Sequence, residues 1–209
     1  MIGKVYSAAV TGIYAVPVEV QADVAPGIPY FELTGNLAGT TKEAKERVRI
    51  AIKNSKFQIN PSKITINMIP ANIRKEGTSY DLAVAVAVLT AVGVIAAKKV
   101  SGALFIGELG LDGGICNVSS ILPMTLCARD NGFTICYVPI GNVGEASLVT
   151  GIRVIGISSL RECVDYINNG CNCRAHVDNN IDNADDNNID FADIRGQASA
   201  KRAITIAAA

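Results

Sequence analysis

The chain has 209 residues, 49% of them hydrophobic, and its 19 basic residues balance its 19 acidic ones. This length and composition predict a globular protein whose main domain buries a sizeable core. The balanced charge excludes a strong overall field toward nucleic acid or anionic lipid, and leaves room only for a local basic patch. The N-terminus lacks the apolar core and cleavage site of a signal peptide. We therefore expect a cytoplasmic protein with reduced cysteines and no membrane partner.

Four segments near the start have the composition of β-strands. Residues 5–10 and 13–20 are rich in β-branched side chains and meet at Thr11-Gly12, which predicts a hairpin. A third strand is predicted at residues 30–33, after a turn rich in proline and glycine. Residues 63–69 alternate apolar and polar side chains, which predicts a fourth strand.

Residues 40–43, Thr-Thr-Lys-Glu, have the form of a capping box and predict the start of a helix. Apolar side chains then recur at helical spacing as far as Ile52, so we expect an amphipathic helix packed on a sheet. Glu43 and Arg47 are four residues apart, which predicts an ion pair. The outward face of the helix carries charged side chains, namely Lys42, Lys45, Glu46, Arg49 and Lys53. Such a face is usually a solvated surface, and contact with nucleic acid is the alternative.

The stretch from Pro70 to Ala97 joins a charged loop to a long apolar segment, and we expect the fold to be built around it. Thr78 or Ser79 is expected to cap the helix that follows, and Asp81 lies in its first turn, where a carboxylate complements the helix dipole. Residues 82–97 are almost wholly apolar, which predicts a core helix. They are too few to cross a bilayer, which needs about 20 residues.

Strands and helices alternate through the following part of the chain. The predicted strands are residues 103–109, 115–118, 134–139 and 153–157. The predicted helices run from Ser119 or Ser120 to about residue 130, lie near Glu145, and cover residues 159–168. This order predicts an α/β fold with a mixed sheet and packed helices.

The six cysteines fall into two groups. Four lie within strand or helix patterns and are interpreted as small core residues, namely Cys116, Cys127, Cys136 and Cys163. Cys171 and Cys173 lie close to the single histidine, His176. A structural zinc site needs four ligands and commonly uses C-x-x-C spacing, so an exposed loop end is the favoured interpretation and a metal site the alternative.

The composition changes abruptly after Cys173. Residues 178–190 consist of Asp and Asn with three apolar exceptions, and such a segment cannot bury enough surface to order itself. Apolar residues then recur at helical spacing between 200 and 208. We therefore predict a main domain at 1–174, a flexible linker at 175–190 and the start of a truncated further domain at 191–209, and expect the chain to be a piece of a longer protein.

Three segments carry a family resemblance. They are KEGTSYDLAVAVAVL at 75–89, FIGELGLDGGICNVSSIL at 105–122 and DFADIRGQASAKRAITIAAA at 190–209. With residues 42–52 and 64–73, they make almost the whole chain similar to the bacterial magnesium-chelatase-like AAA+ ATPases related to the competence-M protein. The resemblance implies a domain of the Lon-protease type, with the ribosomal protein S5 domain 2-like fold, followed by an AAA+ motor.

The last of these segments resembles the entry to that motor. The resemblance implies a ring of six subunits that binds ATP and Mg²⁺ in the motor domain. No Walker A loop occurs in the 209 residues. We therefore expect this fragment to need no cofactor and neither to bind nor to hydrolyse ATP.

The same resemblance raises the question of a peptidase. Lon-type proteases use a serine and a lysine, and the lysine accepts the serine proton. By similarity, Ser79 falls on the serine, but the lysine position falls on Leu122, which cannot take a proton. No other lysine lies between Lys99 and Lys201. We therefore expect no catalytic residue, with Ser79 as a vestigial candidate and a structural helix cap as its favoured role.

Three functional hypotheses follow from the resemblance. The first is a non-catalytic module of an ATP-driven motor that acts on branched DNA in recombination or natural transformation, helping ring assembly or DNA engagement. Its candidate phosphate contacts are Lys42, Lys45, Arg49, Lys53, Arg74 and Lys75. The alternative is a chaperone-like or protease-associated motor that handles protein. A partnership in metal chelation rests on the name of the motor subfamily alone.

Overall fold

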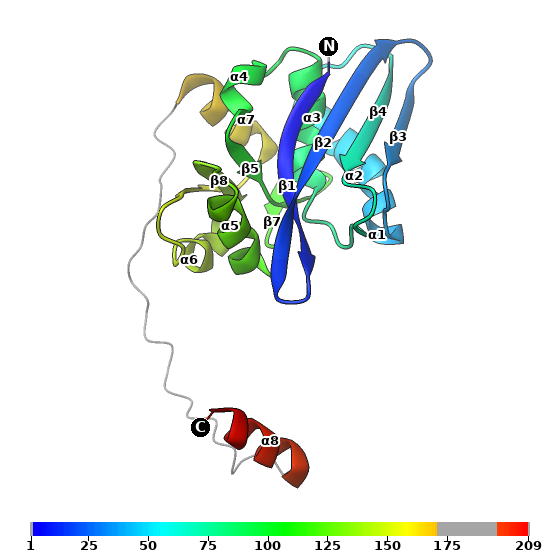
Figure 1. Ribbon diagram of the computed structural model, residues 1–209. Coiled ribbons are helices and arrows are strands. Elements are labelled where there is room, and N and C mark those ends of the chain that lie inside the picture. Colours follow the sequence, from blue (N-terminus) through cyan, green and yellow to red (C-terminus); the bar gives the residue numbers. More distant parts are fainter. Residues whose placement is uncertain (1, 171–195, 209) are drawn as a thin grey trace. The chain divides into compact units, whose positions relative to one another are not determined.

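The computed structural model describes residues 2–170 and 196–208 (Figure 1). The chain divides into two compact units, Met1–Val177 and Asp178–Ala209. In the second unit the described residues form helix α8 (Ala198–Ala208), which confirms the helix predicted there. The predicted linker, together with Cys171, Cys173 and His176, lies outside the described residues.

A mixed seven-stranded sheet forms the centre of the first unit (Figure 1). Its strand order is β3-β4-β2-β1-β5-β8-β9, with β1 (Gly3–Thr11), β2 (Tyr14–Pro26), β3 (Tyr30–Thr34), β4 (Ser62–Ile69), β5 (Ala103–Phe105), β8 (Ile135–Pro139) and β9 (Arg153–Ile157). β2 pairs antiparallel with β1 and β4, whereas the remaining neighbours are parallel. The predicted hairpin at Thr11-Gly12 and the predicted α/β class with a mixed sheet are confirmed.

A second, two-stranded sheet consists of β6 (Glu108–Leu109) and β7 (Ile115–Cys116). The prediction of one strand over residues 103–109 is therefore wrong. The chain leaves the main sheet at Gly107 because its backbone bonds elsewhere: its amide donates to the carbonyl of Ser79 at 2.9 Å, and its carbonyl accepts from the amide of Leu82 at 3.0 Å. These two bonds turn the chain toward the start of the central helix.

Helices pack on both faces of the main sheet. They are α1 (Gly39–Lys42), α2 (Ala44–Asn54), α3 (Asp81–Ala91), α4 (Ala97–Val100), α5 (Ile121–Asp130), α6 (Val143–Ala146) and α7 (Leu160–Asn169), with a 3-10 turn at Ile140–Asn142 before α6. The buried side chains of α2, α3 and α7 belong to the larger core on one face. Those of α5 and α6 belong to a second core on the other face.

The central helix α3 is buried at every position from Asp81 to Ala91, which confirms the predicted core helix. It lies so close to β1 that a Cβ atom at Gly3 would meet the carbonyl oxygen of Ala87 at 2.1 Å. The helix ends at Ala91 and not at 97 as predicted, because Gly93 adopts a left-handed φ of +83°. The amides of Gly93 and Val94 donate back to Thr90 and Leu89, which closes the helix in a Schellman motif.

Two further predictions about this unit need correction. Ser120 occupies the N-cap position of α5, but it is left-handed and its side chain makes no capping bond. Of the four cysteines predicted in the core, Cys127, Cys136 and Cys163 are buried, whereas Cys116 is exposed. Cys116 is exposed because β7 has only two residues and belongs to the small hairpin outside the main sheet.

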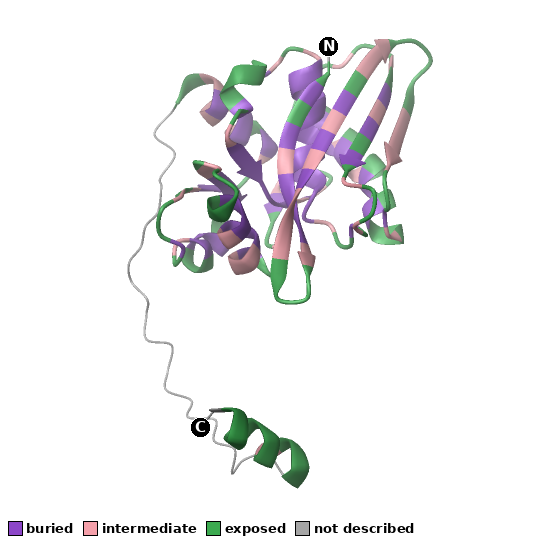
Figure 2. Ribbon diagram, viewed as in Figure 1, coloured by how far each residue is buried: buried purple, intermediate pink, exposed green. Residues whose placement is uncertain are grey.

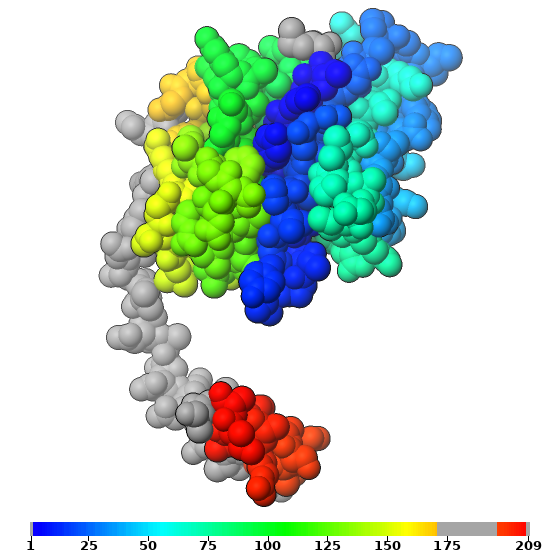
Figure 3. All heavy atoms as spheres, in the orientation of Figure 1, coloured from blue at the N-terminus to red at the C-terminus, as the bar shows by residue number. Residues whose placement is uncertain are grey.

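The face of β2, β4 and β3 opposite α2 and α3 is polar. Buried and more exposed positions alternate along β2 and β4 (Figure 2). On the same side of the sheet, α5 lies beside the hairpin of β1 and β2 (Figure 3). Ile64, Ile66 and Met68 point into the larger core, while Lys63, Thr65 and Asn67 of the same strand are exposed or half-buried. None of the helices that the structure describes has both the length and the apolar character needed to span a bilayer.

Candidate functional site

The loop between β4 and α3 is tied to the segment that precedes α1. The amide of Lys75 donates to the carbonyl of Asn36 at 2.8 Å, and the amide of Ala38 donates to the carbonyl of Lys75 at 2.9 Å. The hydroxyl of Thr41 donates to the carbonyl of Gly77 at 2.9 Å. Thr41 is thus used to anchor the loop, so the predicted capping box at 40–43 is wrong. Glu43 holds the N-cap position of α2 without a side-chain capping bond.

Lys75 is completely buried in this loop. Its ammonium group donates to the carbonyl of Pro70, and burial lowers the pKa of Lys75 below its ordinary value. A buried ammonium group cannot reach a phosphate at the protein surface. The structure therefore removes Lys75 from the predicted set of exposed basic residues, because its backbone pairs with Leu37 and draws the side chain inward.

Ser79, the vestigial serine candidate, is 6% exposed just before α3. The predicted capping role of Thr78 or Ser79 is wrong, since Tyr80 is the N-cap residue and makes no side-chain capping bond. Backbone groups serve the first amides instead: the amide of Asp81 donates to the carbonyl of Thr78 at 3.1 Å. The hydroxyl of Thr78 donates to a carboxylate oxygen of Glu108 at 2.5 Å.

The structure brings no general base to Ser79 within the described residues. Its hydroxyl makes no hydrogen bond there with a lysine, histidine or carboxylate. Leu122 is half-buried on α5, which belongs to the core on the opposite face of the sheet from α3. A serine without a base to accept its proton is a weak nucleophile. The arrangement is compatible with a vestigial serine, and the peptidase prediction itself awaits a direct test.

Asp81 is the most strongly perturbed acidic group near the loop. Its side chain is 1% exposed, and the Nε of Arg47 on α2 lies 2.8 Å from one carboxylate oxygen. A terminal nitrogen of the same guanidinium lies 3.1 Å from the other. Burial raises the pKa of Asp81 to about 6, although the hydrogen bonds from Arg47 oppose the shift. The predicted pair of Glu43 and Arg47 is therefore wrong, because Arg47 faces inward to Asp81.

Three basic side chains of α2 form an exposed row, which we call the basic stripe: Lys45, Arg49 and Lys53. They are four residues apart, so each step along the helix is about 6 Å. The guanidinium of Arg49 lies 2.8 Å from the carboxylate of Glu46 on the same helix, and both side chains are more than half exposed. The opposite side of α2, which includes Val48 and Ile52, is buried in the larger core.

The other two basic candidates are Lys42, on α1, and Arg74, on a segment next to the one that leads into α1. Lys42 is exposed at the end of α1. Arg74 is exposed and forms an ion pair with Glu76, in which the two charged groups are 3.0 Å apart. Because Lys75 pairs with Leu37, the segment that carries Arg74 lies next to the one that leads into α1. The structure thus joins two segments of candidates that are far apart in the sequence.

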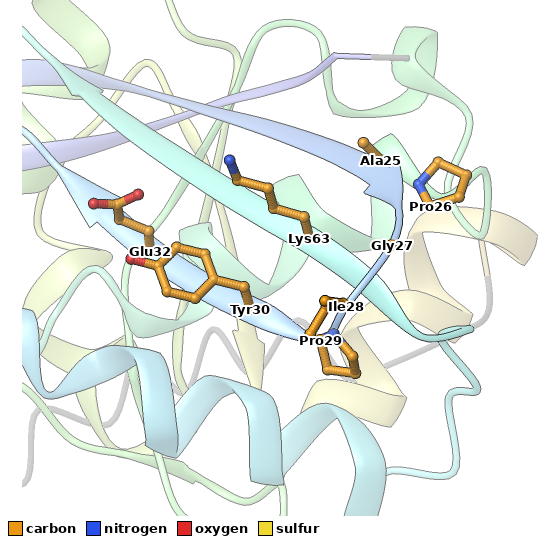
Figure 4. Close-up of a pocket in the computed structure, with 8 residues that line it drawn as sticks. All are labelled: Ala25, Pro26, Gly27, Ile28, Pro29, Tyr30, Glu32 and Lys63. Carbon is orange, nitrogen blue, oxygen red and sulfur yellow. The ribbon is translucent and has the colours of Figure 1, made fainter.

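The opposite end of the sheet offers a second surface, with a hollow where β2 turns into β3 (Figure 4). Apolar residues of the turn form one side of it, namely Pro26, Ile28 and Pro29. Tyr30, Glu32 and Lys63 project from β3 and β4 nearby (Figure 4). β3 is also the last strand at this edge of the sheet.

Lys56 is a basic residue that the sequence analysis did not single out. It follows α2 with a left-handed φ of +62°. The amides of Lys56 and Phe57 donate back to the carbonyls of Lys53 and Ile52, which forms a Schellman motif. The apolar residues Ile52 and Phe57, five positions apart at the end of a predicted helix, were the signal that could have revealed this turn.

Comparison with known proteins places the chain in a family. A family model described as the subunit ChlI of Mg-chelatase matches residues 20–142. The competence protein ComM of Haemophilus influenzae is 33% identical over 209 residues, which cover 98% of this chain and 41% of that protein. The protein YifB of Escherichia coli is 36% identical over 147 residues, which cover 70% of this chain and 29% of that protein.

An uncharacterized protein of Mycobacterium tuberculosis, Rv2897c, is 33% identical over 208 residues, which cover 100% of this chain and 41% of that protein. Since the family model matches more than half of the residues, the chain belongs to the magnesium-chelatase-like family, as its sequence resemblance predicted. The chain spans less than half the length of each of these relatives. What the complete protein does, and what it binds, is therefore put forward only as a proposal.

Proposed function

We propose that this chain is a non-catalytic module of an ATP-dependent AAA+ motor that acts on DNA, and that the basic stripe contacts the phosphate backbone. ComM is named a competence protein, and the family resemblance of the sequence implies action on branched DNA; both support the proposal. In this proposal the complete protein forms a ring of six subunits, and a part of it outside this chain binds ATP and Mg²⁺. The module helps the ring to assemble or to engage branched or single-stranded DNA.

The arrangement of the basic stripe is the observation that carries the proposal. Lys45 and Lys53 make no ion pair with any residue that the structure describes, so their charges are available to a partner. Arg49 is held only by an exposed pair with Glu46, and such pairs are worth at most about 1 kcal/mol. Lysine and arginine side chains that neutralise phosphates release counterions, which drives sequence-independent binding. Lys42 and Arg74 extend the same proposal toward α1.

The Ser79 region supports the non-catalytic part of the proposal. Ser79 has no base among its described hydrogen-bond partners, and the position that resembles the lysine of the proteases is Leu122. Within residues 2–170 and 196–208, no three His, Cys, Asp or Glu side chains are grouped closely enough to hold a metal ion. ATP hydrolysis is assigned to the motor part of the parent protein.

Charge reversal in the basic stripe tests the proposal. The variant Lys45→Glu, Arg49→Glu, Lys53→Glu of the complete protein should bind branched DNA more weakly than the native protein. It should also lose about 2.7 from the slope of log affinity against log salt, which is about 0.9 for each phosphate contact. The matched control carries the same charge change at Lys4, Lys63 and Lys98, which are exposed elsewhere. Equal binding by the two variants at low salt would remove the stripe from the proposal.

Polypeptide is the second candidate substrate. The observation in its favour is β3, which within residues 2–170 is an edge strand of the sheet and could accept an added strand beside the apolar hollow in Figure 4. A measurement of ATP hydrolysis by the complete protein distinguishes the two candidates. Stimulation by branched DNA supports the DNA motor, whereas stimulation by unfolded protein alone supports a chaperone-like motor.

A further inference from the structure

A hollow of about 510 Å³ lies where the end of α2, the turn between β6 and β7, and the start of α7 meet. Its lining includes Ser55, Lys56, Asp112, Gly113, Ser159 and Arg161. From these residues we propose that the hollow is a binding site for a phosphate group. If the phosphate belongs to a nucleic acid, this inference rests on the proposed action on DNA and adds a contact beyond the basic stripe.

The hollow is rigidly built. The amide of Leu160 donates to the carbonyl of Gly113 at 2.8 Å, and the amide of Ile115 donates to the carbonyl of Ser158 at 2.8 Å. These bonds fix the turn to the first residues of α7. The side-chain amide of Asn54 donates to the carbonyl of Leu111 at 2.7 Å, which fixes the same turn to the end of α2. The three elements therefore hold the lining residues in one arrangement.

Ser55 supplies a hydroxyl group at the hollow. The residue is 8% exposed and lines the hollow, but its hydroxyl has no hydrogen-bond partner among the described residues. Gly113 permits this placement, since a Cβ atom there would lie 2.2 Å from the Ser55 oxygen. This oxygen keeps contact with solvent, since the fully buried hydroxyl groups without a partner in the described residues are those of Ser7 and Ser147. A ligand in the hollow could therefore accept a hydrogen bond from Ser55.

Lys56 supplies a positive charge at the hollow. α3, α5 and α7 are each followed by a left-handed glycine, namely Gly93, Gly132 and Gly170. α2 is followed instead by Lys56, in a conformation that costs a residue with a Cβ atom about 1–2 kcal/mol. A lysine at a position that favours glycine places a positive charge at the hollow. Strain of this kind is concentrated at functional sites.

The start of α7 supplies the remaining donors. The amide of Arg161 has no hydrogen-bond partner among the described residues, and it lies in the first turn, where the helix dipole favours an anion. The Arg161 guanidinium lies over the ring of Phe57, 5.2 Å from its centroid, and 3.2 Å from Asp165. Both members of that ion pair are about half exposed, so the guanidinium remains accessible.

One carboxylate also lines the hollow. A carboxylate oxygen of Asp112 accepts a hydrogen bond from the amide of Gly114 at 2.9 Å, so this negative charge is partly offset by a backbone donor. Lys56 and Arg161 leave the lining with one net positive charge, to which the start of α7 adds. The set of donors comprises a hydroxyl, an amide, an ammonium and a guanidinium, which together match the several acceptor oxygens of a phosphate. The basic stripe ends at Lys53, three residues before Lys56, so a bound strand could reach both.

Amide NMR spectra of the 209-residue chain test the site. Two probes are titrated at low salt: inorganic phosphate, and an oligonucleotide without terminal phosphates. We expect inorganic phosphate to shift the amide signals of Ser55, Gly113 and Arg161. The same shifts with the oligonucleotide would assign the site to the nucleic-acid backbone, whereas shifts with phosphate alone would assign it to a free phosphate group. No shift at these amides with either probe would overturn the proposal.

Two variants separate binding from folding. Lys56→Gly should raise the melting temperature by about 2–4 °C by relieving the left-handed strain, and should weaken phosphate binding about tenfold. Ser55→Ala removes a hydroxyl that has no described partner, so it should weaken binding without unfolding the domain. Lys98→Ala removes one exposed charge from α4 and is the control. The site is rejected if Lys56→Gly weakens binding no more than Lys98→Ala does.

The phosphate site and the proposed action on DNA can each fail without the other. If charge reversal in the basic stripe leaves DNA binding unchanged while phosphate still shifts Ser55 and Arg161, the DNA proposal fails and the phosphate site stands. If the stripe variant loses DNA binding while neither probe shifts these amides, the phosphate site fails and the DNA proposal stands.

Discussion

The guanidinium of Arg47 contacts both carboxylate oxygens of Asp81, at 2.8 and 3.1 Å, and so joins α2 to the first turn of α3. The amide of Leu109 also donates to Asp81, at 3.3 Å, which connects the small hairpin to the same point. Asp81 is therefore the place where three elements of the fold meet. The two members of the pair differ in exposure, since the side chain of Arg47 is 21% exposed and that of Asp81 1%.

This difference in exposure predicts unequal effects of removing either partner. Arg47→Ala leaves a buried carboxylate without its cation and should lower the free energy of unfolding by about 3–5 kcal/mol. Asp81→Asn leaves only the more accessible guanidinium unpaired and should cost less. Urea unfolding measures both, with Arg49→Ala, which breaks an exposed pair, as the control. An Arg47→Ala variant as stable as Arg49→Ala would contradict this account.

The Asp81 carboxyl group should also make stability depend on pH. Its pKa of about 6 in the folded domain exceeds the ordinary value of 3.8, so the folded state binds this proton more tightly than the unfolded chain does. The resulting stabilisation is fully present below about pH 4 and is lost as the pH rises through about 6. The free energy of unfolding of the native chain, minus that of Asp81→Asn, should therefore fall between pH 4.5 and pH 7.5. A constant difference would show that Asp81 keeps an ordinary pKa.

Gly113 should tolerate a side chain less well than Gly132. Both have a left-handed φ, but a Cβ atom at Gly113 would collide with Ser55, while one at Gly132 would meet nothing within 4 Å. Gly132→Ala therefore measures the backbone strain alone, expected to cost about 1–2 kcal/mol. Gly113→Ala should cost more in urea unfolding, and the added change Ser55→Gly should recover part of that excess. Equal costs for the two alanine variants would exclude the collision.

Ser79 should not react as a catalytic serine. Since its hydroxyl has no described base as a partner, a fluorophosphonate probe should leave the complete protein unlabelled. Ser79→Ala should then change neither labelling nor the hydrolysis of an unfolded protein. Ser158→Ala, which changes an exposed serine, serves as the control. Labelling that disappears in Ser79→Ala and persists in Ser158→Ala would restore the peptidase hypothesis.

Local patterns predicted most of the main sheet and its helices. The alternation in 63–69 identifies a strand because β4 has one face in the core. The β-branched residues before and after Thr11-Gly12 identify the two hairpin strands by their composition. The central helix was predicted because a long apolar segment indicates a helix buried on all sides, and every position in it is buried. Its end was misplaced because the apolar residues continue to Ala97. Gly93 was the available signal for the true end.

Contacts between distant segments account for the errors at the site. Asp81 lies 34 residues from Arg47, so the sequence offered Glu43 as the nearer partner. Lys75 lies in a charged loop, and a charged loop predicts an exposed side chain. Its backbone pairing with Leu37, which the sequence does not reveal, turns the side chain inward. The basic side chains of α2 were predicted well because their outward direction follows from helix periodicity alone.

The burial of α3 has a consequence for the chain before it folds. Residues 82–89, Leu-Ala-Val-Ala-Val-Ala-Val-Leu, alternate with a period of two and contain neither charge nor proline. Outside a helix, such a segment has the features that promote cross-β aggregation. The folded domain hides all of it between the sheet and the neighbouring helices. We therefore expect a folded α3 to limit fibril formation, and a variant that loosens the Arg47–Asp81 contact should lose solubility as well as stability.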